Sequence, residues 1–218
     1  MYLRLLDRVL YRRPFEGGGA RRYARDQRRA FGDLDERLLD RLAPHLTGAR
    51  RLLDLGCGPG AFAAAAAARH PDLAVIGVDP SRAFARPGVD LSRAARPGVT
   101  WVRAAGEALP FADRSMDVAV CLSSIRHVRD RRATLRELRR VVHGCAVIVE
   151  LDPAARGARV AAHTGGLASA VYRRAFGPLV LRTAPPAAEI ARLAEAAGFA
   201  LVGCAPDPIQ PVYVMELA

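Results

Sequence analysis

The sequence predicts an α/β fold in which parallel strands alternate with helices, and two segments carry this prediction. A short apolar strand, Leu52–Leu55, runs directly into a glycine-rich turn, which opens into an alanine-rich helix over residues 61–69. A second apolar strand, residues 73–78, follows that helix and ends at Asp79. Strand, helix and strand in this order form one unit of a parallel sheet, which binds its ligands at the carboxyl ends of the strands.

The turn carries glycine at every second position, at Gly56, Gly58 and Gly60. Glycine has no Cβ atom and tolerates positive φ, so a ligand can approach such a loop closely. We therefore expect the loop to present bare backbone amides at a helix N-terminus. A carboxylate at Asp79, at the tip of the next strand, suits the two hydroxyls of a ribose.

The acid at Asp54 argues against a dinucleotide as the ligand of this loop. A carboxylate beside a pyrophosphate is unfavourable, whereas it can hold a cationic amino group directly or through water. The loop also lacks the Gly-x-x-Gly spacing that dinucleotide sites carry after the second glycine. A ligand that carries a cationic amino group fits this acid better than NAD does.

The chain resembles the class I S-adenosylmethionine-dependent methyltransferases, in particular the small-molecule branch often called type 11, which includes ubiquinone- and biotin-pathway enzymes. The segments that carry the resemblance are 53–60, 77–81, 106–111, 115–120, 135–142 and 196–199. The resemblance implies a Rossmann-like three-layer sandwich. Its sheet would have seven mostly parallel strands in the order 3-2-1-4-5-7-6, with the last strand antiparallel, beneath an N-terminal helical cap.

The resemblance also implies which residues bind the cofactor, S-adenosylmethionine, and its product, S-adenosylhomocysteine. Glu107 and its neighbours would contact the adenine edge. In the family the residue two before this glutamate is commonly an aspartate that accepts a hydrogen bond from the adenine amino group, and here it is Ala105. The full set of expected cofactor-binding residues is Asp54, Gly56, Cys57, Gly58, Gly60, Asp79, Pro80, Gly106, Glu107 and Ser123.

The best candidate for a general base is His127, because it follows the fourth strand at the edge where reacting groups lie and histidine titrates near neutrality. Many members of the branch carry histidine here without a proven proton transfer. The candidates for contact with the acceptor are Tyr23, Asp152, His163 and Tyr172. Packing of Tyr23 on the core and a turn at Asp152 explain two of these residues equally well.

The 218 residues are expected to form one domain, with a helical cap over 1–48 and a methyltransferase domain over 49–218. A variable segment, about 154–185, is expected to cover the acceptor as a lid. Trp101, the only tryptophan, is expected to be structural. The further expected elements are helices over 2–13, 21–30, 33–46, 131–142 and 187–197, and strands over 99–103, 116–122, 146–151, 199–204 and 212–217.

Composition narrows the choice of partners. The net charge is +11, but all 33 basic residues are arginine, which indicates a compositional bias of the coding sequence more than a selected polyanion-binding face. The four cysteines are isolated, so neither a metal site nor a disulfide framework is expected. No apolar run approaches the ~20 residues that span a bilayer, and we expect a cytoplasmic protein without a membrane span.

The sequence thus predicts a methyltransferase that acts on a small-molecule acceptor by direct in-line transfer, at O, N or C. Two alternatives stay open. The basic charge leaves room for an RNA methyltransferase, although no Asn/Asp-Pro-Pro-Tyr/Phe motif and no Pro-Cys nucleophile follow the fourth strand. The replacement at Ala105 leaves room for a binding module that keeps the fold without transfer activity. The acceptor and the oligomeric state are not encoded in any of these motifs.

Overall fold

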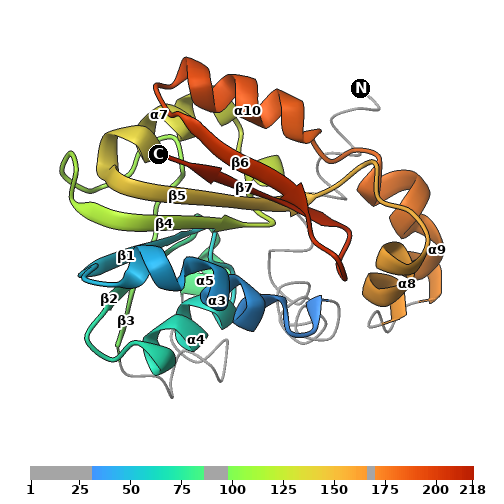
Figure 1. Cartoon of the computed structure of the whole chain (residues 1–218), viewed down its shortest axis with the longest axis horizontal. Coiled ribbons are helices and arrows are strands. Elements are labelled where there is room, and N and C mark those ends of the chain that lie inside the picture. Colours follow the sequence, from blue (N-terminus) through green and yellow to red (C-terminus); the bar gives the residue numbers. More distant parts are fainter. Residues whose placement is uncertain (1–30, 86–97, 166–169) are drawn as a thin grey trace.

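A seven-stranded sheet of order β3-β2-β1-β4-β5-β7-β6 forms the centre of the computed structural model, which describes residues 31–85, 98–165 and 170–218 (Figure 1). β7 is antiparallel to both β5 and β6, and the other neighbouring strands are parallel. The predicted strand order and the antiparallel last strand are confirmed. The strands are β1 (Arg51–Leu55), β2 (Ala74–Val78), β3 (Val99–Val102), β4 (Met116–Leu122), β5 (Val142–Leu151), β6 (Leu201–Pro206) and β7 (Val212–Leu217).

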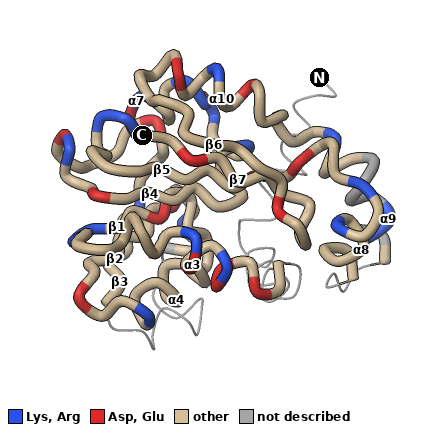
Figure 2. The backbone as a smooth tube through the Cα atoms, in the orientation of Figure 1, with Lys and Arg blue, Asp and Glu red and all other residues tan. Residues whose placement is uncertain are grey.

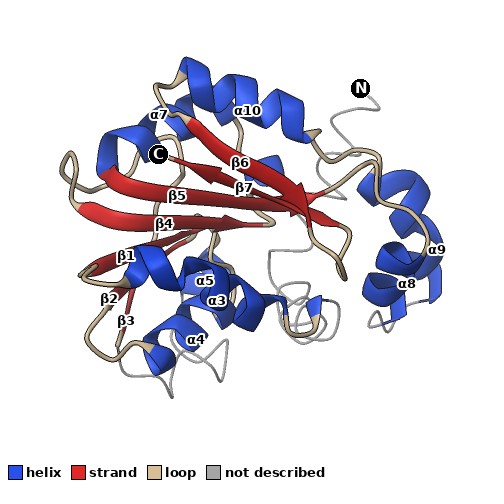
Figure 3. Ribbon diagram, in the orientation of Figure 1, coloured by secondary structure: helices blue, strands red, loops and turns tan. Residues whose placement is uncertain are grey.

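Helices cover both faces of this sheet, which makes the predicted three layers (Figure 3). α3 (Leu34–Leu46) and α4 (Ala61–Arg69) pack on one face, and α7 (Arg131–Val141) and α10 (Ala187–Ala196) pack on the other. Alternate residues of each strand enter opposite cores, because successive side chains in a strand point to opposite faces. In β1, for example, Leu52 belongs to the core under α3 and α4, and Leu53 to the core under α7 and α10.

The carboxyl ends of β4 and β5 lead into short helices. η3 (Ile125–His127) follows β4, and α8 (Ala158–Gly165), α9 (Ala170–Ala175) and η4 (Phe176–Leu181) follow β5. Figure 1 shows α8 and α9 beyond that end of the sheet. The described part of the predicted variable segment is therefore mostly helical and lies at the edge where an open α/β sheet binds ligands. The short α5 (Arg82–Ala85) follows β2 in the same way.

Most predicted elements are confirmed, and two strand boundaries are corrected. The fifth strand begins at Val142, four residues earlier than expected, because Val142 already pairs with Met116 before a register shift. The sixth strand begins at Leu201, because the Phe199 amide still donates to the Ala194 carbonyl at the end of α10. The helices expected over 2–13 and 21–30 lie outside the described residues. Among the described residues, no helix has the length and apolarity needed to cross a membrane.

The Trp101 ring fills the space beside the glycine loop. A Cβ atom added at Gly60 would lie 1.9 Å from Trp101 Cη2, and one added at Gly77 would lie 2.8 Å from Trp101 Cζ3. These two positions are therefore glycine for the sake of packing, and Gly60 also has φ +80°. The indole packs against the core under α3 and α4, as expected of a structural residue.

The tight packing at Gly60 gives a first prediction. Gly60→Ala should lower the free energy of unfolding by about 1–2 kcal/mol for the left-handed backbone, and by about 1–3 kcal/mol more for displacement of Trp101. Gly48→Ala is the matched control, because Gly48 has φ +77° and nothing within 4 Å of an added Cβ. Urea unfolding of both variants measures the difference. Equal losses would contradict the packing of Trp101 against Gly60.

Candidate functional site

The glycine loop between β1 and α4 is closed by hydrogen bonds of its own backbone. The amides of Gly56 and Cys57 both donate to the Val78 carbonyl at the end of β2, at 2.7 and 3.0 Å. The amide of Gly60 donates to the Cys57 carbonyl at 2.8 Å. The expectation of a loop with bare amides is therefore wrong at these positions, because the loop folds back on the neighbouring strand and uses them internally.

Asp79 completes this closure from the end of β2. Its Oδ2 accepts from the Gly58 amide at 2.9 Å and its Oδ1 from the Ser81 amide at 2.8 Å. Each carboxylate oxygen has a second lone pair, so the group keeps acceptor capacity for hydroxyls. Pro80 beside it is exposed, and its carbonyl accepts from Arg103 Nε at 3.2 Å. Asp79 therefore fixes the loop and is partly exposed at the predicted ribose position.

Asp54 is the unusual group of the site. Its side chain lies within β1 and is 2 % exposed, and its Oδ2 has no hydrogen-bond partner among the described residues. Burial raises the pKa of this carboxyl from 3.8 to about 8, and the charges of Asp35 and Asp79 add to the rise, against a hydrogen bond from the Ala63 amide. An orphaned buried carboxylate is costly unless a cation or a donor meets it. Asp54 therefore fits the cationic amino group predicted from the sequence.

The carboxyl end of β4 meets the glycine loop through Ser124, the second of two serines. Ser124 Oγ donates to the Leu55 carbonyl at 2.7 Å, and a Cβ atom at Gly56 would lie 2.4 Å from Ser124 Cβ. Ser123 has φ +53°, a conformation that non-glycine residues seldom adopt, and is 4 % exposed. Ser123, a predicted site residue, precedes the serine that contacts the loop, and its amide donates to the Val149 carbonyl of β5 at 2.6 Å. The sequence pattern carries no signal for the strain at Ser123.

Glu107 and Gly106 connect the expected adenine-side segment to α7. Glu107 Oε1 accepts from the amides of Arg129 and Asp130, at 2.7 and 3.0 Å, just before α7. A Cβ atom at Gly106 would lie 2.9 Å from Thr134 Cγ2. Glu107 therefore has a structural role at the start of α7. Its contact with adenine stays a prediction.

His127 ends η3 and is half-buried. Arg126 Nε donates to His127 Nε2 at 3.0 Å. Burial, together with the charges of Arg126 and Arg131, holds the pKa of His127 well below its usual 6.5. The imidazole is therefore neutral at neutral pH and has one nitrogen engaged by an arginine, so its role as general base stays a prediction.

A buried arginine and a buried glutamate, which the sequence analysis missed, meet where β4 and β5 end. Glu150 is fully buried in β5, and its Oε2 accepts from the Arg126 amide at 3.2 Å. Arg126 Nε lies 3.6 Å from Glu150 Oε1, and the Arg126 side chain is 10 % exposed. Arg126 Nη1 has no hydrogen-bond partner among the described residues. The only available signal was an acid inside an otherwise apolar strand.

An arginine-rich cavity of about 520 Å³ lies beside this pair, between η3, α7 and α10. Arg131 Nη1 pairs with Glu189 Oε1 at 3.0 Å across its mouth. Arginines outnumber acids in the lining, which makes the cavity cationic. The lining residues are Arg126, Val128, Arg129, Asp130, Arg131, Arg132, Glu189 and Leu193.

The described residues that were predicted to contact the acceptor lie outside the arginine-rich cavity and interact with other residues. Asp152 Oδ1 accepts from the Ala154 amide at 2.9 Å and its Oδ2 pairs with Arg159, which supports the turn interpretation. His163 is buried in α8 and packs edge-on against Phe31. Neither residue lines the arginine-rich cavity. Tyr172 belongs to α9, but its side chain is outside the described part, as is all of Tyr23.

Comparison with known sequences finds similarity to methyltransferases over part of the chain. Residues 52–144 match the family model described as a methyltransferase domain. An uncharacterized methyltransferase of Mycobacterium sp. (strain JLS) is 41 % identical over 46 % of this chain and 38 % of its own length. The ubiquinone/menaquinone biosynthesis C-methyltransferase UbiE of Syntrophotalea carbinolica is 37 % identical over 44 % of this chain and 41 % of its own length. The match therefore spans about two fifths of these relatives.

Solved structures share the fold. An S-adenosylmethionine-dependent methyltransferase from Mesorhizobium loti superposes with a TM-score of 0.60 at 18 % identity. The superposition covers 86 % of this chain and 99 % of that one. At this identity the likeness concerns the fold alone, and it includes the elements outside the segment matched by the family model.

The buried state of Asp54 gives a second prediction. Because the pKa of Asp54 is higher in the folded than in the unfolded protein, the folded state binds more protons between pH 4 and 8, and stability falls as pH rises through this window. Asp54→Asn removes this fall in the free energy of unfolding, which amounts to at most about 1.4 kcal/mol per pH unit. Urea unfolding at pH 5, 6, 7 and 8 measures it, with Asp72→Asn, at an exposed position, as control. Parallel pH profiles for wild type and Asp54→Asn would contradict the assignment.

Proposed function

We propose that the chain is a class I S-adenosylmethionine-dependent methyltransferase that transfers the methyl group of S-adenosylmethionine to a small-molecule acceptor, which its partial match to the methyltransferase domain and to methyltransferase relatives supports. The observation that carries this proposal is Asp54, a buried carboxylate with an orphaned oxygen beside the glycine loop. A cationic amino group would favour and pair with the ionised form of this carboxyl, whereas a dinucleotide pyrophosphate would oppose its ionisation.

The cofactor is proposed to lie along the carboxyl edge of β1, β2 and β4. Asp54 would hold the amino group of its methionine part, and Asp79 the ribose hydroxyls. Gly106 and Glu107 would face the adenine edge, and Ser123, whose buried hydroxyl has no hydrogen-bond partner among the described residues, would approach the methionine part. The bound cofactor supplies a methyl group on a sulfonium, so the leaving group is neutral.

The acceptor is proposed to enter the arginine-rich cavity. Its volume of about 520 Å³ suits a small molecule, since ligand pockets typically measure about 300–1,000 Å³. The buried Arg126 and the neighbouring Arg131 would favour an acceptor that carries a carboxylate or a phosphate. A C-methyltransferase for a small molecule, UbiE, is among the relatives, which supports this class of acceptor.

The protein's part in the reaction would be mainly to position the acceptor and exclude water. His127 stays the candidate base, and the Arg126 hydrogen bond to its Nε2 would have to open before that nitrogen takes a proton. Tyr23, Asp152, His163 and Tyr172 stay candidates for acceptor contact from the cap and from the segment after β5. Direct in-line transfer to O, N or C follows from the cofactor's chemistry.

An RNA acceptor is the weaker proposal. Figure 2 shows acidic positions interspersed with the arginines along the described chain. Salt-dependent RNA binding that leads to methylated RNA would reverse this ranking. The binding module without transfer activity rests on Ala105, which is exposed and offers no side-chain acceptor for adenine.

Calorimetric titration with S-adenosylhomocysteine tests the proposed cofactor and gives a third prediction. We expect micromolar binding of S-adenosylhomocysteine and none of NAD. At pH 7 binding should release close to one proton, because the cationic amino group favours the ionised form of Asp54, whose pKa is about 8 in the free protein. Titration in buffers of different ionisation enthalpy measures the proton. Asp54→Asn should bind more weakly and release none, and failure of the folded wild type to bind would favour the binding module.

Asp79 gives a fourth prediction. Asp79→Ala should weaken S-adenosylhomocysteine binding at least about tenfold, since a charge-assisted hydrogen bond is worth about 1.5–3 kcal/mol. Asp72→Asn is the control and should leave the affinity unchanged, because Asp72 is exposed and lies before β2, at the end of the strand opposite to Asp79. Circular dichroism checks that each variant is folded. Unchanged affinity of folded Asp79→Ala would remove Asp79 from the ribose site.

A further inference from the structure

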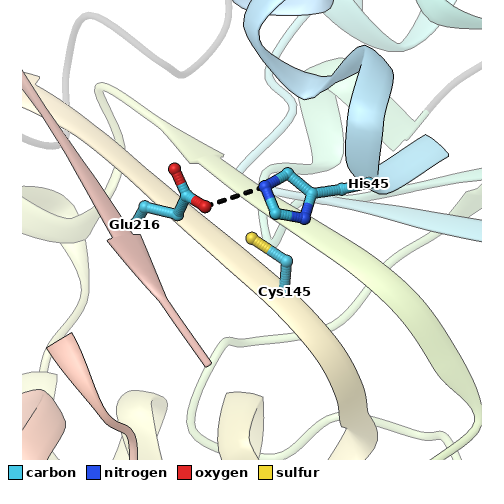
Figure 4. A group of neighbouring side chains, drawn as sticks. All are labelled: His45, Cys145 and Glu216. Carbon is cyan, nitrogen blue, oxygen red and sulfur yellow. Dashed lines mark ion pairs between the residues drawn. The ribbon is translucent and has the colours of Figure 1, made fainter. Parts of the chain in front are cut away.

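Three side chains with metal-binding atoms converge near the amino end of β5, away from the cofactor edge (Figure 4). His45 comes from the last turn of α3, Cys145 from β5 and Glu216 from β7. His45 Nε2 lies 2.8 Å from Glu216 Oε1, and the nitrogen, sulfur and oxygen ligand atoms all lie within 4.8 Å of one another. Cys145 itself is buried, with 6 % of its surface exposed.

The donor set is one that zinc uses. Zn²⁺ binds histidine nitrogen, cysteine sulfur and carboxylate oxygen in tetrahedral geometry, and sites with three protein ligands keep a fourth position for water. A thiolate and a carboxylate together carry two negative charges, which balance a divalent ion. We propose that His45, Cys145 and Glu216 bind a divalent transition-metal ion, with Zn²⁺ as the ion that best fits these ligands.

The geometry needs only side-chain adjustment to accept the ion. Metal–ligand bonds of about 2.0–2.3 Å place tetrahedral ligand atoms about 3.3–3.8 Å apart. The His45–Glu216 contact therefore has to open slightly and the widest separation has to close. The His45 and Glu216 side chains are 32 % and 19 % exposed, so an ion can reach them from solvent. When the ion binds, the Cys145 thiol loses its proton to solvent, and the thiolate sulfur coordinates the metal.

A metal at this position would connect α3 to the sheet. α3 is held there by apolar contacts of its leucines with the core that it shares with α4. A bound ion would add direct bonds from the last turn of α3 to the neighbouring strands β5 and β7. An ion that binds the folded but not the unfolded chain raises stability in proportion to the logarithm of its concentration. The site would therefore stabilise the attachment of α3 to the sheet. This inference does not depend on the methyl-transfer proposal.

Cobalt titration tests the site and gives a fifth prediction. Co²⁺ added to the metal-free full chain should give a thiolate-to-cobalt charge-transfer band in the near ultraviolet, saturating at one ion per chain. Cys145→Ser should lose the band. Cys204→Ser is the matched control, because Cys204 is an exposed thiol on β6 outside the cluster, and it should keep the band. No band in wild type, or loss of the band in Cys204→Ser and not in Cys145→Ser, would overturn the proposal.

A second measurement separates metal binding from ordinary packing. Zn²⁺ should displace Co²⁺ and raise the melting temperature of wild type by several degrees. Glu216→Gln keeps an oxygen beside His45 but removes the anionic ligand, so it should weaken Co²⁺ binding at least tenfold while melting normally without metal. If Glu216→Gln binds Co²⁺ as tightly as wild type, or if Zn²⁺ leaves the wild-type melting temperature unchanged, the cluster is a hydrogen-bonded packing contact.

Discussion

The hydrogen bonds that close the glycine loop onto the end of β2 are the constraint on which the candidate cofactor site depends. They fix the loop against β2 through Val78 and Asp79, while Ser124 ties the same loop to the end of β4. Three strands therefore position one turn. Gly56 and Gly60 permit this closeness, because a Cβ atom at either would collide with Ser124 or Trp101.

Buried charge distinguishes the ligand edge from the rest of the sheet. Asp54 and Glu150 lie in strands whose other residues are mostly apolar, and burial raises the pKa of both carboxyls. Glu150 is compensated by Arg126 and by two backbone amides, whereas Asp54 Oδ2 has no partner among the described residues. Such groups cost stability, and a fold keeps them where a ligand can use them. The contrast between the two carboxyls supports Asp54 as a ligand contact and Glu150 as the support of an arginine.

Local sequence patterns predicted those features of the fold that residues close together in the sequence determine, such as the bounds of single strands and helices. The strand over 116–122 and the helix over 61–69 have the predicted bounds, because apolar runs and alanine content act over a few residues. The closed amides of the loop, the Arg126–Glu150 pair and the convergence of His45, Cys145 and Glu216 depend on packing between distant segments. The predicted strand order makes β5 and β7 neighbours, but no spacing in the sequence indicates which of their residues meet one another and α3, so the isolated cysteines gave no indication of a metal site.

β5 carries polar groups toward opposite faces at its two ends. Cys145 belongs to the core shared with α3 and α4, whereas Glu150, an odd number of residues later, points to the other side, where it meets Arg126. Five residues of strand separate them by roughly 17 Å. Substitutions more than about 7–10 Å apart that share no partner usually add in their effects on stability. The two ends of this strand can therefore change independently in evolution, one at its contact with α3 and the other at its pair with Arg126.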